Sequence, residues 1–321
     1  MSHLDLTVAG LGLVSPVATT PRAHAFLIRA EAAMHAGRAF VDGSGEPLEV
    51  LHCPLVDPQR PLAERLSELG DLALTSILAP LDAWPGRRSI IAQLVVPELE
   101  PPLDGDLFAR CEASWAERHQ LRFGARSVGA ASVYQALAAA PEAFQRGVSG
   151  LLLLALDTAA HPAILEQRLR PVSRWMQAPP RLSEAAAALL VVPRADGLPT
   201  TFGKIRYAGV AMGVGSDRDD DPSDGRAMTA LLRHAATTSP LPWGNSYGPF
   251  TVDSLRRKSF HAGLVRNRHA FALDGEQICV EHAIGRVGAA SALAAPRLRA
   301  RPSAPRPPRP PRRHRHLGPL P

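Results

Sequence analysis

Residues 150–158, GLLLLALDT, form an uninterrupted apolar run with the length of one β-strand. A short continuous apolar run of this kind is typical of a strand that is covered on both faces. The stretch SEAAAALLVVPR at 183–194 has the same character and predicts a second buried strand. Two such strands, flanked by helical segments, predict a layered α/β fold.

Further strands and helices are expected to alternate with these two runs. Pro16 ends the apolar stretch LTVAGLGLVSP, and Thr20 followed by Pro21 is typical of a helix N-terminus. Gly147 is suited to end the helix that precedes residues 150–158. The expected strands are 6–16, 87–98 and 202–212, and the expected helices are 62–81, 104–121, 132–147 and 225–238.

The positive charge of the chain is concentrated at its C-terminal end. Residues 296–321 hold eight arginines, nine prolines and no acid, so the formal charge of +6 leaves −2 for residues 1–295. The body of the protein is therefore not expected to bind nucleic acid. The Arg/Pro-rich tail has little to bury and is expected to be disordered or polyproline-like.

The remaining composition indicates an ordinary globular protein without metal or cofactor. Cys53, Cys111 and Cys279 lie far apart without a C-x-x-C pair, which predicts a cytoplasmic protein without a disulfide framework or zinc site. No apolar run reaches about 18 residues, so no membrane span is expected. The acidic stretch 216–225 lacks calcium-loop spacing, and GVAMGVGSD lacks the context of a nucleotide site.

Several separated segments together resemble the thiolase superfamily, and within it the β-ketoacyl-ACP synthase branch. Each motif is degenerate, but their order and spacing agree with the family over roughly residues 5–295. The matching segments are VAGLGLVSPVATT at 8–20, SVGAASVYQALAAAPEAFQRGVSGLLLLALDT at 127–158, LSEAAAALLVV at 182–192 with Glu184 in the family's Glu place, WGNSYGPFTVDS at 243–254 and IGRVGAASALAA at 284–295.

This resemblance implies a five-layer α-β-α-β-α sandwich built from two similar halves, usually as a homodimer. The first half would span about residues 1–198 and the second about 199–295, with the 202–212 strand at its start. The family continues beyond this point with closing strands, so the second half is expected to be incomplete at the C-terminus. The tail 296–321 is either an interaction arm attracted to acidic partners or, as its composition favours, the product of a frameshift or wrong gene model.

The resemblance also places the nucleophile. A condensing enzyme needs a thiolate at a helix N-terminus, where the helix dipole and backbone N–H groups stabilise negative charge. Counting back six residues from Ala136 puts Ala130 in the cysteine place, and a shift of one residue puts Gly129 or Ala131 there. None of these side chains can attack a thioester.

The two histidine places are substituted as well. The first falls on Tyr247, whose phenol is a poor base because its ordinary pKa is near 10. The second falls near Arg286, with His282 four residues upstream and read as a surface or capping residue. Three separate losses argue against condensing chemistry.

Two serines are candidates for an alternative nucleophile. Ser127, a candidate N-cap, and Ser132 are the hydroxyls nearest the nucleophile place, and either would need a general base within reach. His119 and His282 are the candidate bases, although their spacing from the two serines matches no known catalytic pattern. Cys111 is read as a packing residue, and Asp157 as a capping residue near the expected pocket.

The sequence thus predicts a β-ketoacyl synthase-like protein without condensing activity. It would act as a non-catalytic or acyl- and carrier-protein-binding subunit, as a homodimer or as a heterodimer with an active synthase. Its expected ligands are an acyl carrier protein or acyl-CoA, with no cofactor. The alternatives are an acyltransferase or hydrolase that uses Ser127 or Ser132, and a truncated product without function.

Overall fold

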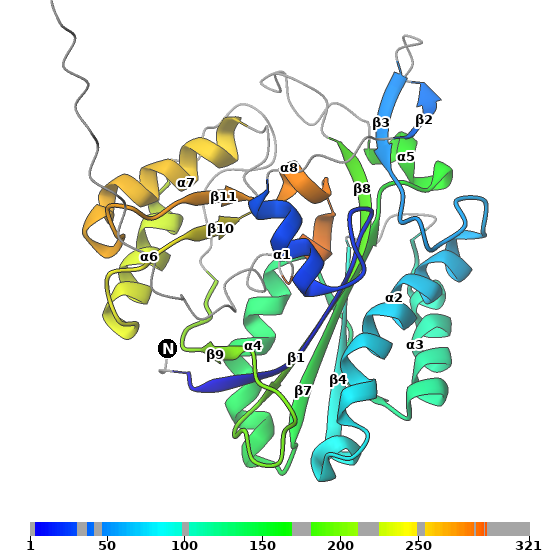
Figure 1. Cartoon of the computed structure of the whole chain (residues 1–321), viewed down its shortest axis with the longest axis horizontal. Coiled ribbons are helices and arrows are strands. Elements are labelled where there is room, and N and C mark those ends of the chain that lie inside the picture. The colour runs from blue at the N-terminus through cyan, green and yellow to red at the C-terminus, as the bar shows by residue number, and fades with distance from the viewer. Residues whose placement is uncertain are drawn as a thin grey trace, which may run out of the picture.

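The computed structural model of the chain describes residues 4–30, 37–41, 47–97, 103–168, 181–210, 225–248, 254–285, 287–291 and 293. One large mixed sheet runs through the molecule, with helices on both faces (Figure 1). Its strands are β1 (Leu6–Val14), β2 (Gly37–Val41), β3 (Pro47–Leu51), β4 (Ile90–Val96), β5 (Arg122–Phe123), β6 (Ser127–Val128), β7 (Gly150–Thr158), β8 (Leu182–Val192) and β9 (Gly203–Ile205).

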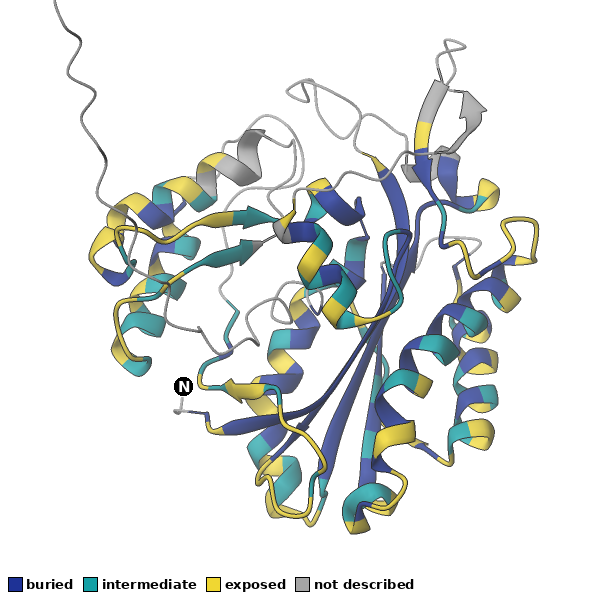
Figure 2. Cartoon of the chain, in the orientation of Figure 1, coloured by how far each residue is buried: buried dark blue, intermediate teal, exposed yellow. Residues whose placement is uncertain are grey.

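The centre of this sheet is the pair β7–β8, which runs antiparallel along its whole length. The pair is in register from Leu151 opposite Val191 to Thr158 opposite Glu184. Strand β4 lies parallel to β7 on one side, and β1 lies antiparallel to β8 on the other. Every residue of β7 and β8 is buried, as predicted for strands covered on both faces (Figure 2).

The helices form a layer on each face of the sheet. The bounds are α1 (Pro21–Arg29), α2 (Leu62–Leu78), α3 (Gly105–His119), α4 (Ala131–Gln145), α5 (Pro162–Arg168) and α8 (Val280–Ile284). Helices α2 and α3 share a core with Leu152 and Leu154, whereas α4 and α8 share the opposite core with Leu153 and Ala155. Alternate residues of one strand thus serve two separate cores.

A smaller unit lies beside the α4 face (Figure 1). It contains α6 (Arg226–Thr238), α7 (Ser254–Arg266) and the parallel strands β10 (Ser246–Gly248) and β11 (Gln277–Cys279). Tyr247 of β10 and Ile278 of β11 pack against the α4-side core. In the described part of the chain, the second sheet therefore has two short strands, whereas the first is extensive.

Most of the expected elements are present. The strand over 150–158 is confirmed, and the second buried strand is 182–192. Thr20 caps α1 by accepting a hydrogen bond from the backbone N–H of Ala23 at 3.3 Å, and Gly147 adopts a left-handed φ of 87° after α4. No described helix is long and apolar enough to span a membrane.

One expected strand is wrong in extent and place. Of the described residues 202–210, only Gly203–Ile205 form a strand, and this β9 pairs antiparallel with β1 at the edge of the first sheet. It does not join the β10–β11 sheet of the expected second half. The division of the chain at about residue 198 stays a prediction. Residues 216–224 and the tail 296–321 lie outside the described residues.

The close approach of β1 to α2 depends on glycine. A Cβ atom added to Gly12 would lie 2.2 Å from the backbone oxygen of Ala73 on α2. We expect Gly12→Ala to lower the free energy of unfolding by about 1–3 kcal/mol, because helix and strand must separate. Urea denaturation measures the change.

Gly244→Ala is the matched control, because a Cβ there meets no atom within 4 Å. An equal loss in both variants would show that the tight contact is not the cause.

Candidate functional site

The N-terminus of α4 occupies the position predicted for the nucleophile. Strand β6 pairs with β4, and the N–H of Gly129 donates a hydrogen bond to the carbonyl of Val96 at 2.8 Å. Gly129 has a positive φ of 80° and turns the chain into the helix. Ala130 is the N-cap residue of α4 and provides no side-chain cap. A methyl group therefore stands where the resemblance places a thiol.

The two nearby hydroxyls are engaged without a base. The Oγ of Ser127 accepts a hydrogen bond from the side-chain amide of Gln93 at 3.1 Å, and Ser127 lies in β6 rather than at the N-cap. Ser132 is buried and donates to the carbonyl of Gly129 at 2.7 Å. Among the described residues, neither hydroxyl contacts a histidine.

The candidate bases lie elsewhere. His119 ends α3 on the opposite face of the sheet, and its Nε2 is 2.7 Å from Oδ1 of Asp71. His282 is exposed on α8. Tyr247, in the first histidine place, is half-buried in β10, while Arg286, in the second, lies outside the described residues. The structure does not bring a histidine to either serine.

Asp157 connects the first sheet to the loop of the second histidine place. It is buried at the end of β7, and its Oδ2 accepts a hydrogen bond from the N–H of Ala289 at 3.1 Å. Gly288, with a φ of 45°, permits this contact, since a Cβ there would lie 1.7 Å from that oxygen. The expected capping role of Asp157 is confirmed.

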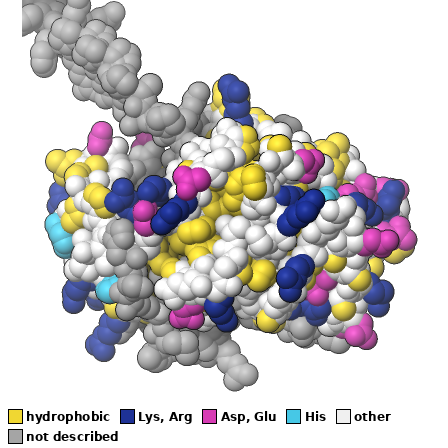
Figure 3. All heavy atoms as spheres, turned by 90° about the horizontal axis from the view of Figure 1, so that it is seen from below, with side chains coloured by type: hydrophobic (Ala, Val, Ile, Leu, Met, Phe, Trp, Pro, Cys, Tyr) yellow, Lys and Arg dark blue, Asp and Glu magenta, His cyan; other side chains and the backbone are white. Residues whose placement is uncertain are grey.

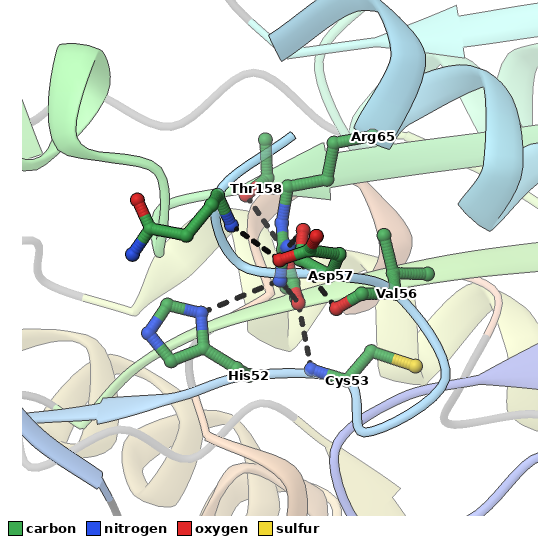
Figure 4. Close-up of polar contacts among 8 residues, drawn as sticks. His52, Cys53, Val56, Asp57, Arg65 and Thr158 are labelled. Atoms are coloured by element: carbon green, nitrogen blue, oxygen red, sulfur yellow. Dashed lines mark hydrogen bonds and ion pairs between the residues drawn. The ribbon is translucent and has the colours of Figure 1, made fainter. Parts of the chain in front are cut away.

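The other face of the sheet holds a buried ionic network that the sequence did not reveal as one unit (Figure 4). Arg65 of α2 and Glu184 of β8 form a fully buried ion pair, in which Nε donates to Oε2 at 2.7 Å and Nη2 donates to Oε1. Thr158 Oγ1 donates to Oε2 at 3.1 Å, and the N–H of Cys53 donates to Oε1 at 2.6 Å.

The remaining donors of Arg65 secure the loop that follows β3. Its Nη1 donates to the carbonyl oxygens of Val56 and Asp57, and its Nη2 lies 3.3 Å from Nδ1 of His52. Because a guanidinium only donates, this contact requires His52 Nδ1 to carry no proton. The network thus joins α2, β7, β8 and this loop, which is a structural task away from the α4 N-terminus.

Burial changes the titration of the groups around this ion pair. Desolvation lowers the pKa of His52, and the nearby Arg65 lowers it further against the opposing effect of Glu184. Desolvation also lowers the pKa of His161. The thiols of Cys53 and Cys111 have pKa values raised to about 11, first by burial, so neither is a reactive thiolate at neutral pH. Cys111 is confirmed as a packing residue.

We expect Glu184→Gln to lower the free energy of unfolding by about 3–5 kcal/mol, because it leaves the charge of Arg65 buried without its counterion. Chemical denaturation of the two proteins measures the difference.

Glu49→Gln is the matched control, since the pair that Glu49 forms with Arg181 at 2.7 Å is exposed. Its expected loss is about 1 kcal/mol or less. Equal losses would contradict the role given to burial.

The lowered pKa of His52 predicts a pH-dependent stability. As the pH falls below about 6.5, His52 binds a proton in the unfolded chain more readily than in the folded protein, where its pKa is lowered. The unfolded state then binds more protons, so the free energy of unfolding falls as the pH decreases from about 7 to 5.5. Urea unfolding across this range measures the slope.

His52→Gln should flatten this slope, and His282→Gln on the exposed surface of α8 should leave it unchanged. If His52→Gln leaves the slope unaltered, His52 is not the group that makes the stability depend on pH.

Comparison with known proteins bears on the fold. The sequence matches no protein-family model and no curated protein. Three similar solved structures are the ishigamide ketosynthase/chain length factor, a type II polyketide synthase acyl-carrier protein in complex with its ketosynthase, and the module 6 ketosynthase of the bacillaene synthase from Bacillus subtilis 168.

Sequence identity to these structures is low, but the structural agreement covers nearly the whole chain. The first is 20% identical with a TM-score of 0.64, over 92% of this chain and 90% of that one. The second is 14% identical with a TM-score of 0.67, over 91% and 85%. The third is 15% identical with a TM-score of 0.66, over 92% and 60%. The chain therefore has the thiolase-like fold of ketosynthases and chain length factors.

Proposed function

We propose that this protein is a ketosynthase-like subunit without condensing activity. The observation that carries the proposal is the N-terminus of α4, where Ala130 presents a methyl group. Acyl transfer to an enzyme needs a side-chain nucleophile whose developing charge is stabilised by a helix terminus and backbone N–H groups. This site keeps the helix terminus and lacks the nucleophile.

The proposed role is that of a binding subunit, comparable to a chain length factor. Its partners would be an acyl carrier protein or acyl-CoA, and either an active synthase or a second copy of this chain. Two similar structures support these choices, since one contains a ketosynthase/chain length factor and one a ketosynthase with its acyl-carrier protein. We place the protein in the cytoplasm.

The edge of the large sheet supports pairing with another subunit. Strands β5 and β6 pair with β4 on one side, and no described strand pairs with their other side. Val128 of β6 is 50% exposed. A sheet edge of this kind offers unpaired N–H and C=O groups to a strand of a partner.

The alternative of a serine acyltransferase or hydrolase has less support. Ser127 contacts an amide, which cannot accept a proton, and Ser132 donates to a backbone carbonyl. A serine nucleophile needs a general base in hydrogen-bond contact. No described histidine contacts Ser127 or Ser132.

Intact-protein mass spectrometry after incubation with a panel of acyl-CoA and acyl-carrier-protein thioesters tests the proposal. We expect no covalent adduct on the native protein. The positive control is Ala130→Cys, which places a thiol at the helix N-terminus and should gain one acyl group. The matched negative control is Ala139→Cys on the exposed middle of α4.

An adduct at Ser127 or Ser132 would overturn the non-catalytic assignment. Size-exclusion chromatography with an active ketosynthase, together with a carrier-protein binding assay, tests the subunit role. Absence of an adduct, of pairing and of binding would favour the product without function.

A further inference from the structure

Residues 52–61 connect β3 to α2, and we call this segment the strap. Two of its side chains, Cys53 and Val56, are buried in the core on the α2 side. Arg65 donates from Nη1 to the carbonyl oxygens of Val56 at 3.3 Å and of Asp57 at 2.5 Å (Figure 4). The position of the strap therefore depends on the orientation of one buried guanidinium.

His52 begins the strap and contacts the same guanidinium. Nη2 of Arg65 donates to Nδ1 of His52 at 3.3 Å, so that nitrogen is an acceptor while the contact exists. A proton on Nδ1 would set two donors and two positive charges against each other. Because the ring of His52 is only half-buried, water can deliver this proton.

A second histidine contacts the other end of the strap. His161 follows β7, is half-buried, and forms a hydrogen bond with the backbone of Arg60. Its Nδ1 accepts a hydrogen bond from the N–H of Ala163 at 3.2 Å, so this nitrogen also carries no proton. Both ends of the strap are thus in contact with a histidine whose neutral form fits its partners.

The charged groups that act on these two histidines come from α2 and β8. Burial is the largest cause that lowers the pKa of His52 and of His161. The charge of Arg65 lowers both values further, whereas that of Glu184 raises them. The folded surroundings therefore favour the neutral form of both rings.

Charges farther from the histidines have both signs. Arg60 forms ion pairs with Glu64 and Glu68 at the surface, and Arg181 of the β8 side pairs with Glu49 of β3. Figure 3 shows the same mixture of Lys and Arg with Asp and Glu on the face of the molecule seen from below. Because such surface charges are screened by salt, the immediate contacts of the two histidines govern their titration.

We propose that the strap is a pH-sensitive switch, closed over Arg65 while His52 and His161 are neutral and released when they bind protons. In the open strap, both rings regain an ordinary pKa near 6.5. The open state then binds protons more readily, so lowering the pH from 7.5 to 5.5 favours it by up to about tenfold for each histidine. Release admits water to the pair of Arg65 with Glu184. This inference goes beyond the proposed function, because it concerns neither the α4 N-terminus nor a partner.

Thiol labelling of the full chain tests the switch. Cys279→Ser leaves two buried thiols, one in the strap at Cys53 and one in α3 at Cys111, both with a pKa raised to about 11. The reagent is dipyridyl disulfide, which reacts with thiols at acidic as well as neutral pH, and peptide mass spectrometry assigns each product. Relative to a free cysteine peptide, labelling of Cys53 should be about tenfold faster at pH 5.5 than at pH 7.5. Labelling of Cys111 should stay at least about tenfold slower than that of Cys53, because it needs global rather than local opening.

His52→Gln separates the histidine from its hydrogen bond, since the amide oxygen of glutamine can still accept from Arg65 and does not titrate. In this variant the effect of pH on labelling of Cys53 should fall at least about threefold. His282→Gln, at an exposed position of α8, is the matched control and should keep the full effect. Circular dichroism at pH 7.5 checks that each variant is folded, and the comparison of Cys53 with Cys111 needs no substitution at either histidine.

Equal labelling rates for Cys53 and Cys111 would show that only global unfolding exposes them, which would overturn the switch. A labelling rate of Cys53 that does not rise on acidification would overturn it as well. So would a rise that His52→Gln leaves intact. Each of these outcomes leaves the proposed function standing, since that function is tested by the absence of an acyl adduct.

Discussion

The rest of the structure depends on the burial of β7 and β8 on both faces. Their backbone groups pair with each other and with β4 and β1, while alternate side chains pack into two cores. Because no polar side chain interrupts Leu151–Leu156, water is excluded from both sides, and helices must cover each face. The layered order follows from this requirement.

The two polar residues at the end of β7, Asp157 and Thr158, point to opposite faces of the sheet. Thr158 faces the α2 side and hydrogen-bonds Glu184, whereas Asp157 faces the α4 side and holds the loop at Ala289. Neighbouring residues of one strand thus secure two layers. The period of two along a strand assigns the structural network to one face and the α4 N-terminus to the other.

At the α4 N-terminus, the geometry for stabilising a negative charge survives without a nucleophile to generate it. Gly129 still provides the turn into the helix, and Ala130 occupies the cap. Among the described residues, no histidine contacts Ser127 or Ser132. The proposed non-condensing role rests on this combination, because an acyl intermediate needs a side-chain nucleophile.

Local patterns were sufficient for several elements. The apolar runs at 150–158 and 182–192, the capping pair Thr20 and Pro21, and Gly147 are signals that lie within a few residues of their effect. The expected strand over 202–212 is shorter among the described residues, where only Gly203–Ile205 pair with β1. The short strands β10 and β11 have no periodicity of their own and exist through pairing with each other.

The sequence by itself determined the two central strands, the main helices, the alanine at position 130 and the resemblance to ketosynthases. Only the tertiary structure decided that Glu184 neutralises Arg65, 119 residues away in the chain, and that no described histidine contacts Ser127 or Ser132. Hydrophobic periodicity and caps act over one or two turns and can be read locally. Ion pairs and hydrogen bonds between distant segments depend on the path of the whole chain, which a linear pattern does not contain.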